Sequence, residues 1–179
     1  MTCIVGMVKK NKVLIGADSA GVGDGDITIR KDKKIFKNNG FVIGCTSSFR
    51  MIQLLQFSFT PPEIKGKELF KYMCTDFIDE VRKCFTDGGY IQKYTDGDEK
   101  GGSFLVGING RLFNVQDDFQ VSESIINYDA IGCGYAYALG SLFSTKDIGL
   151  SEKKRLKIAL KTAVKFSTGV EPPFVFYCA

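Results

Sequence analysis

Two Asn-Gly pairs, Asn39-Gly40 and Asn109-Gly110, each lie between short runs of β-branched and aromatic residues, and they constrain the fold more than any other feature of the sequence. Both residue types accept the positive φ angles of a two-residue hairpin turn. Each pair therefore predicts two adjacent antiparallel strands. The strands predicted on either side of these turns are residues 33–37, 41–46, 103–108 and 111–115.

The remaining segments alternate between strand and helix periodicity. A further hairpin is predicted from residues 2–8 and 12–19 around Asn11, more strand is expected up to Ile131, and residues 174–178 read as a last strand. Apolar residues recur three and four apart in four other segments, which predicts helices there. These helices are predicted at residues 49–57, 67–85, 134–143 and 151–166. Pro61 and Pro62 separate the first two, and Ser151 is expected to cap the last.

This order of elements predicts an α+β fold with a four-layer α/β/β/α sandwich of two antiparallel sheets. Each helix pair would cover the outer face of one sheet. A simpler two-layer α+β domain would also accommodate the segments. The length of 179 residues suits a single domain covering residues 1–179.

Composition excludes several function classes. A net charge of +4 is too small for a phosphate-neutralising surface, so no nucleic acid partner is expected. The six cysteines lack metal-ligand spacing, no run approaches about 20 apolar residues, and no charged leader precedes a long apolar run at the N-terminus. We therefore expect a cytoplasmic, soluble protein with no membrane partner, no metal and no cofactor. The chain contains no histidine, which excludes Ser-His-Asp chemistry.

Thr2 is the first candidate catalytic residue. If Met1 is removed, Thr2 carries a hydroxyl and an α-amine whose ordinary pKa of about 7.7 to 8.0 suits a general base. Such a site also needs a fixed cation, a carboxylate to hold that cation, and an amide donor for the oxyanion. Lys34, Asp18 and Gly44 are candidates for these three roles. Taken singly, each has an ordinary structural explanation, such as a turn cap or a bend in a strand.

Taken together, these residues resemble the N-terminal third of the proteasome β subunit and its bacterial HslV-type relative, which are N-terminal nucleophile (Ntn) hydrolases. The likeness lies in the segments "TCIVGMV", "VLIGADSAG", "KKIF" and "FVIGCTSS". Thr2, Asp18 and Lys34 follow one another at intervals of 16 residues, as the functional residues of that family do. The resemblance implies that Thr2 is the nucleophile, that Lys34 lowers its pKa, and that Asp18 orients Lys34. It also implies that Gly44 supplies the oxyanion N–H.

The resemblance continues more weakly towards the C-terminus. In "AIGCGYAYALG", Cys133 occupies the place of a serine that supports the nucleophile's amine in that family. In "KFSTGV", Thr168 stands for a second serine and Lys165 stands where an aspartate is usual. The segments "IGADS", "CTSSFRM" and "FSTGV" look closest to phage- and prophage-associated proteasome-like proteins.

The resemblance implies a threonine peptidase that forms a homo-oligomeric ring and cleaves peptides or unfolded protein. A separate ATP-dependent unfoldase could feed the ring, since the chain has no P-loop motif of its own. Two alternatives remain at this stage. One is a small-amide amidohydrolase on the same fold, and the other is a catalytically degenerate ring or assembly protein.

Overall fold

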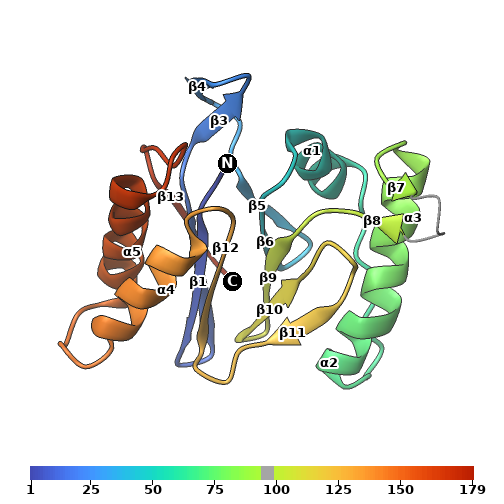
Figure 1. Ribbon diagram of the computed structural model, residues 1–179. Coiled ribbons are helices and arrows are strands. Elements are labelled where there is room, and N and C mark those ends of the chain that lie inside the picture. Colours follow the sequence, from blue (N-terminus) through green and yellow to red (C-terminus); the bar gives the residue numbers. More distant parts are fainter. Residues whose placement is uncertain (94–98) are drawn as a thin grey trace.

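The chain folds into two stacked antiparallel sheets with helices on both outer faces, as the computed structural model shows for residues 1–93 and 99–179 (Figure 1). The four-stranded sheet has the order β12-β1-β2-β13, with strands Tyr128–Ile131, Ile4–Lys9, Lys12–Ala17 and Val175–Cys178. The five-stranded sheet has the order β11-β10-β9-β6-β5, with strands Val121–Glu123, Arg111–Val115, Phe104–Ile108, Phe41–Cys45 and Ile35–Asn38. The predicted four-layer sandwich is confirmed, and the two-layer alternative is wrong.

Helices α4 (Tyr135–Ser144) and α5 (Glu152–Phe166) cover the four-stranded sheet (Figure 1). The five-stranded sheet is covered by α1 (Phe49–Phe57) and by a longer rod built from α2, η1 and α3. The rod's three parts are Leu69–Tyr72, the π-helical turn Met73–Phe77, and Ile78–Asp87. All four predicted helices are therefore present. Within the described residues, no helix is both long and apolar enough to cross a membrane.

The hairpin turns explain the strand pairing. Lys10 and Asn11 join β1 to β2 with φ angles of 49° and 57°, and Asn39 and Gly40 join β5 to β6 with 46° and 86°. The turn between β9 and β10 repeats this pattern with 48° and 73°. Positive φ at both central residues matches the right-handed twist of the flanking strands. These turns fix the register, which decides the face of the sheet on which each side chain lies. Because both faces are covered, β6 and β9 are buried along their whole length.

A further hairpin was not predicted from the sequence. Strands β3 (Ala20–Gly23) and β4 (Asp26–Ile29) project beyond the sandwich, close to the N-terminus (Figure 1). Their turn is Asp24-Gly25, with φ angles of 51° and 88°. The turn signal was present, but glycines in the first strand weaken its β-propensity. Strands β7 (Gln92–Lys93) and β8 (Glu99–Lys100) form another short ladder that was not predicted.

Apolar side chains between the layers hold the sandwich together. Ile4, Ile15, Val42 and Leu105 lie between the two sheets and are almost fully buried. Separate apolar clusters fill the space between each sheet and its helices. One detail of the sequence prediction is wrong: Ser151 lies at the start of α5, but its side chain makes no capping hydrogen bond.

Candidate active site

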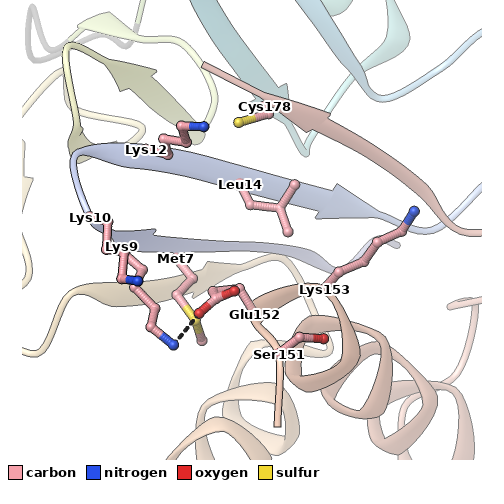
Figure 2. Close-up of a pocket in the computed structure, with 9 residues that line it drawn as sticks. All are labelled: Met7, Lys9, Lys10, Lys12, Leu14, Ser151, Glu152, Lys153 and Cys178. Carbon is pink, nitrogen blue, oxygen red and sulfur yellow. Dashed lines mark ion pairs between the residues drawn. The ribbon is translucent and has the colours of Figure 1, made fainter.

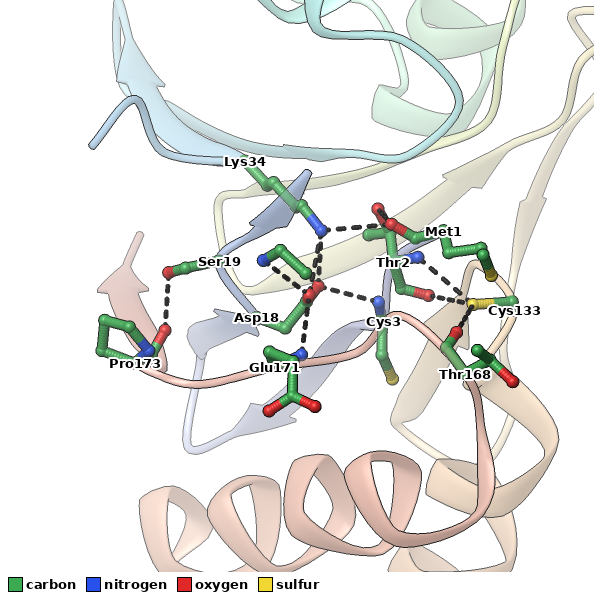
Figure 3. A network of polar contacts seen from close by, with 11 residues as sticks. Met1, Thr2, Cys3, Asp18, Ser19, Lys34, Cys133, Thr168, Glu171 and Pro173 are labelled. Atoms are coloured by element: carbon green, nitrogen blue, oxygen red, sulfur yellow. Dashed lines mark hydrogen bonds and ion pairs between the residues drawn. The ribbon is translucent and has the colours of Figure 1, made fainter. Parts of the chain in front are cut away.

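Asp18 and Lys34 form a buried ion pair at one end of the sheets. Lys34 Nζ lies 2.8 Å and 3.0 Å from the two carboxylate oxygens of Asp18, and the two side chains are 2% and 0% exposed. The same carboxylate accepts hydrogen bonds from the backbone N–H groups of Cys3 (3.0 Å), Ala20 (3.0 Å) and Glu171 (3.3 Å). A buried charge is tolerated only when it is paired and hydrogen-bonded in this way. The pair therefore joins four separate segments of the chain at one point (Figure 3).

Burial lowers the pKa of Lys34, and the neighbouring Asp18 carboxylate opposes that shift. Desolvation penalises the charged form of an amine, whereas an adjacent carboxylate stabilises it. The net direction is a lowered pKa, with the ammonium group of Lys34 held beside the Asp18 carboxylate. A cation held in place in this way is what the activation of a nearby nucleophile needs.

Thr2 is next to this pair. Its side chain is almost completely buried, and its Oγ1 donates a hydrogen bond to the carbonyl oxygen of Met1 at 2.5 Å. Lys34 Nζ donates to the same carbonyl oxygen at 3.3 Å. A hydroxyl and an ammonium group thus converge on one peptide carbonyl (Figure 3). The structure brings together the three residues that the sequence spaced 16 apart.

Cys133 faces the backbone of Thr2. The N–H of Thr2 donates to Cys133 Sγ at 3.2 Å, and the thiol lies 3.4 Å from the Thr2 carbonyl oxygen and 3.6 Å from that of Thr168. Gly132 permits this approach, because its φ is +89° and a Cβ there would overlap the Thr2 carbonyl. It is the backbone carbonyl of Thr168 that contacts the thiol. Lys165 is exposed in the last turn of α5.

Gly44 does not lie where an oxyanion donor is needed. It is a buried residue of β6 that pairs with Leu105 of β9. Two residues further along the chain, the N–H of Thr46 donates a hydrogen bond to the Ser103 carbonyl at 3.1 Å. Because every second residue of an antiparallel strand bonds to the same neighbour, the N–H of Gly44 is also directed to β9 and is already used in the sheet. A Cβ at Gly44 would come within 2.7 Å of Ile4. Gly44 therefore allows the two sheets to approach, and its expected role as amide donor is corrected.

The start of α1 lies at the candidate site instead. A small polar cavity of about 60 Å³ is lined by Thr2, Lys34 and the segment 45–49. Ser48 is the N-cap of α1 and its Oγ accepts from the N–H of Arg50 at 3.1 Å, while Ser47 has a φ of 64°. The N-terminus of a helix carries partial positive charge and free peptide N–H groups, which suit a developing oxyanion. The signal in the sequence was the pair of serines before the helical pattern.

Other reactive groups do not contribute here. Cys3 follows Thr2 but is completely buried, and burial raises the pKa of its thiol to about 12. This confirms the prediction that Cys3 is buried, although the residue lies immediately before β1 and not within the strand. A buried thiol with a raised pKa is a poor nucleophile. Among the described residues, no group of three or more His, Cys, Asp or Glu side chains is placed to hold a metal ion.

Comparison with solved structures defines the class of fold. BPH from Thiobacillus denitrificans superposes with a TM-score of 0.84 at 18% identity, covering 99% of this chain and 98% of that chain. HslV from Trypanosoma brucei gives 0.69 at 15% identity over 99% and 98%, and Anbu from Yersinia bercovieri gives 0.68 at 15% over 99% and 81%. No protein-family model and no curated protein matches the sequence. The chain therefore has the proteasome-type fold of the Ntn hydrolases, which confirms the fold that the resemblance implied.

Proposed function

We propose that the chain, once Met1 is removed, is a threonine peptidase that uses Thr2 as its nucleophile. The observation that carries the proposal is the convergence of Thr2 Oγ1 and Lys34 Nζ on a single peptide carbonyl. That carbonyl belongs to Met1, and on this proposal its removal leaves Thr2 Oγ1 and Lys34 Nζ facing the cavity that a substrate carbonyl would enter. Thr2 also suits the removal of Met1, because a small second residue permits trimming of the initiator methionine.

Removal of Met1 converts the amide of Thr2 into a free amine. The amine then takes the proton of Oγ1 as the oxygen attacks the substrate carbonyl, and the resulting oxyanion faces the start of α1. Collapse of the tetrahedral intermediate breaks the peptide bond, returns the proton to the leaving amine, and leaves an ester on Thr2. Water hydrolyses the ester and regenerates the hydroxyl. Lys34, held by Asp18, favours the deprotonated forms of Thr2 throughout.

The assembly and substrate belong to the same proposal. We infer a homo-oligomeric ring that encloses Thr2, peptides or unfolded protein as substrate, and an ATP-dependent unfoldase as a possible partner. The proteasome-type fold supports the ring, and exposed apolar side chains on α4 and α5 such as Tyr135, Phe143 and Phe166 are compatible with subunit contacts. The closer likeness to phage-associated proteins and the cytoplasmic location stay predictions.

Intact mass, with and without a peptide epoxyketone, tests the proposal. BPH has been solved in complex with epoxomicin, so this class of probe suits the fold. The expected result is loss of Met1 and one adduct on the native chain, with no adduct on Thr2→Ala and an unchanged adduct on Thr28→Ala, whose side chain is exposed on β4. Retention of Met1 together with absence of an adduct would overturn the peptidase proposal and favour a non-catalytic ring protein. An adduct with turnover of small amides but not of peptides would favour the amidohydrolase.

Substitutions of Cys133 are predicted to change the rate of peptide hydrolysis in opposite directions. Cys133→Ser is expected to raise kcat/KM for a peptide substrate about three- to tenfold, because a hydroxyl is a stronger hydrogen-bonding partner for the Thr2 amine than a thiol. Cys133→Ala is expected to lower it by a similar factor. Steady-state hydrolysis of a fluorogenic peptide measures both, with Cys74→Ser as the control, since Cys74 is an exposed cysteine of the rod. Equal rates for the serine and alanine variants would remove Cys133 from the proton network.

A further inference from the structure

A groove that shares no lining residue with the Thr2 cavity runs between α5 and the edge of the four-stranded sheet. Two cavities, of about 430 and 510 Å³, meet at Lys153, which lines both. Figure 2 shows the first of them, where Leu14 and Cys178 lie on adjacent strands and Lys153 comes from α5. The second is lined by Lys153, Lys157 and Lys161 of α5 and by Val164, Pro172, Phe174 and Phe176. The groove therefore combines a row of lysines with an apolar floor.

The lysines of this row have no counter-charge within the part of the chain that the structure describes. No carboxylate of those residues lies within ion-pair distance of Lys153, Lys157 or Lys161. Glu152, the acidic residue at the start of the same helix, pairs with Lys9 instead. Lys153 Nζ lies 5.6 Å from the centre of the Phe176 ring, which keeps the charge above the floor. The row thus presents unneutralised positive charge along one side of the groove.

The other side of the groove is an open sheet edge. Among the strands of residues 1–93 and 99–179, β13 lies at the edge of its sheet and pairs with β2 alone. Ala179 and Val13 exchange two backbone hydrogen bonds, so by alternation Val175 and Tyr177 bond to β2 while Phe176 and Cys178 direct their N–H and C=O groups to the open edge. An open edge of this kind accepts an added strand.

The spacing of the lysines matches such a strand. Lysines four residues apart on a helix are separated by about 6 Å along its axis. Alternate residues of an extended chain are separated by roughly 6.6–6.8 Å and point to the same face of the sheet. An added strand would therefore direct every second side chain towards the lysine row and over the Phe174 and Phe176 rings.

We propose that this groove binds an extended acidic segment of a partner protein, which adds to β13 as a fifth strand and places carboxylates at alternate positions against Lys153, Lys157 and Lys161. The methylene groups of glutamate side chains would cover the aromatic floor. Backbone hydrogen bonds to β13 would supply affinity, and the lysine row would favour segments with acidic residues at alternate positions. The site is independent of Thr2 and does not rest on the proposed peptidase activity.

Fluorescence anisotropy with the full chain and a labelled Glu-Val-Glu-Val-Glu-Val peptide tests this proposal. The alternating peptide is expected to bind about tenfold more tightly than a Glu-Glu-Glu-Val-Val-Val peptide of the same composition. Lys157→Glu/Lys161→Glu is expected to weaken binding at least about tenfold. Lys154→Glu/Lys165→Glu alters the net charge of the same helix equally, outside the groove, and is expected to change the dissociation constant less than about twofold.

A second measurement separates strand addition from general attraction between charges. N-methylation of the peptide amides that would bond to β13 is expected to abolish binding, whereas methylation of the alternate amides is tolerated. This comparison uses the native protein, so it does not depend on the folding of a variant. Equal weakening by the two lysine pairs, equal binding of both methylated peptides, or no binding of the alternating peptide would each overturn the proposal.

Discussion

Peptide hydrolysis by the Met1-free chain is expected to fall by at least about 10³-fold when Thr2 is replaced by alanine. The change removes the nucleophile and leaves only the binding and oxyanion contributions, which give a small residual rate. The surrounding ion pair of Asp18 and Lys34 does not involve the Thr2 side chain and should persist. Steady-state turnover of a fluorogenic peptide measures the loss, and the thermal midpoint checks that the variant is folded.

Two further variants test the roles of the Thr2 hydroxyl and the Thr2 amine separately. Thr2→Ser keeps the hydroxyl and the amine, so it should retain far more activity than Thr2→Ala. A chain with an N-terminal extension that cannot be removed keeps the hydroxyl but has no free amine, and it should lose activity by about 10²- to 10⁴-fold, the range of a general base. Activity of Thr2→Ala above a tenth of the native rate would identify a different nucleophile, with Cys133 as the neighbouring candidate.

The sequence predicted the proximity of Thr2, Asp18 and Lys34 because the hairpin turns determine where these residues lie. The Lys10-Asn11 and Asn39-Gly40 turns set the registers of β1–β2 and β5–β6, and those registers carry Asp18 and Lys34 to the same end of the two sheets as Thr2. The regular interval of 16 residues therefore reflects the geometry of these hairpins as well as the likeness to a family. The π-turn Met73–Phe77 inside the long rod has no comparable local signal, because its residues keep ordinary helical spacing.

Gly44 shows where this reasoning fails. The sequence showed a small residue between a strand and a helix, but it could not separate a free amide from one already bonded in a ladder. That distinction depends on the pairing of β6 with β9, two strands about 60 residues apart in the chain. The contact of Thr168 through its carbonyl, and the position of α1 against Thr2, likewise depend on how distant segments pack together. Pairing partners over such distances are set by the whole core rather than by local pattern.

The stability of the fold is expected to fall by about 3–5 kcal/mol in Lys34→Met. Methionine keeps the aliphatic length of the side chain, so the change mainly leaves the buried Asp18 carboxylate without its counter-charge. For a chain of this size the thermal midpoint should fall by roughly 6–20 °C. Urea unfolding at pH 7 measures the free energy directly, and Lys37→Met, at an exposed residue of β5, is expected to stay within about 0.5 kcal/mol of the native value.

A double-mutant cycle with Asp18→Asn isolates the pair itself. Because removing one partner leaves the other buried and unpaired, the double variant should be less destabilised than the sum of the two single variants. Additive effects, or a Lys34→Met chain within about 1 kcal/mol of native, would show that the three backbone N–H groups of Cys3, Ala20 and Glu171 alone hold the carboxylate. In that case Lys34 would contribute little to the free energy of unfolding, and its role would be confined to Thr2. With strong coupling, the residue proposed to activate Thr2 also joins the two sheets, so the candidate site and the fold cannot be altered separately at this position.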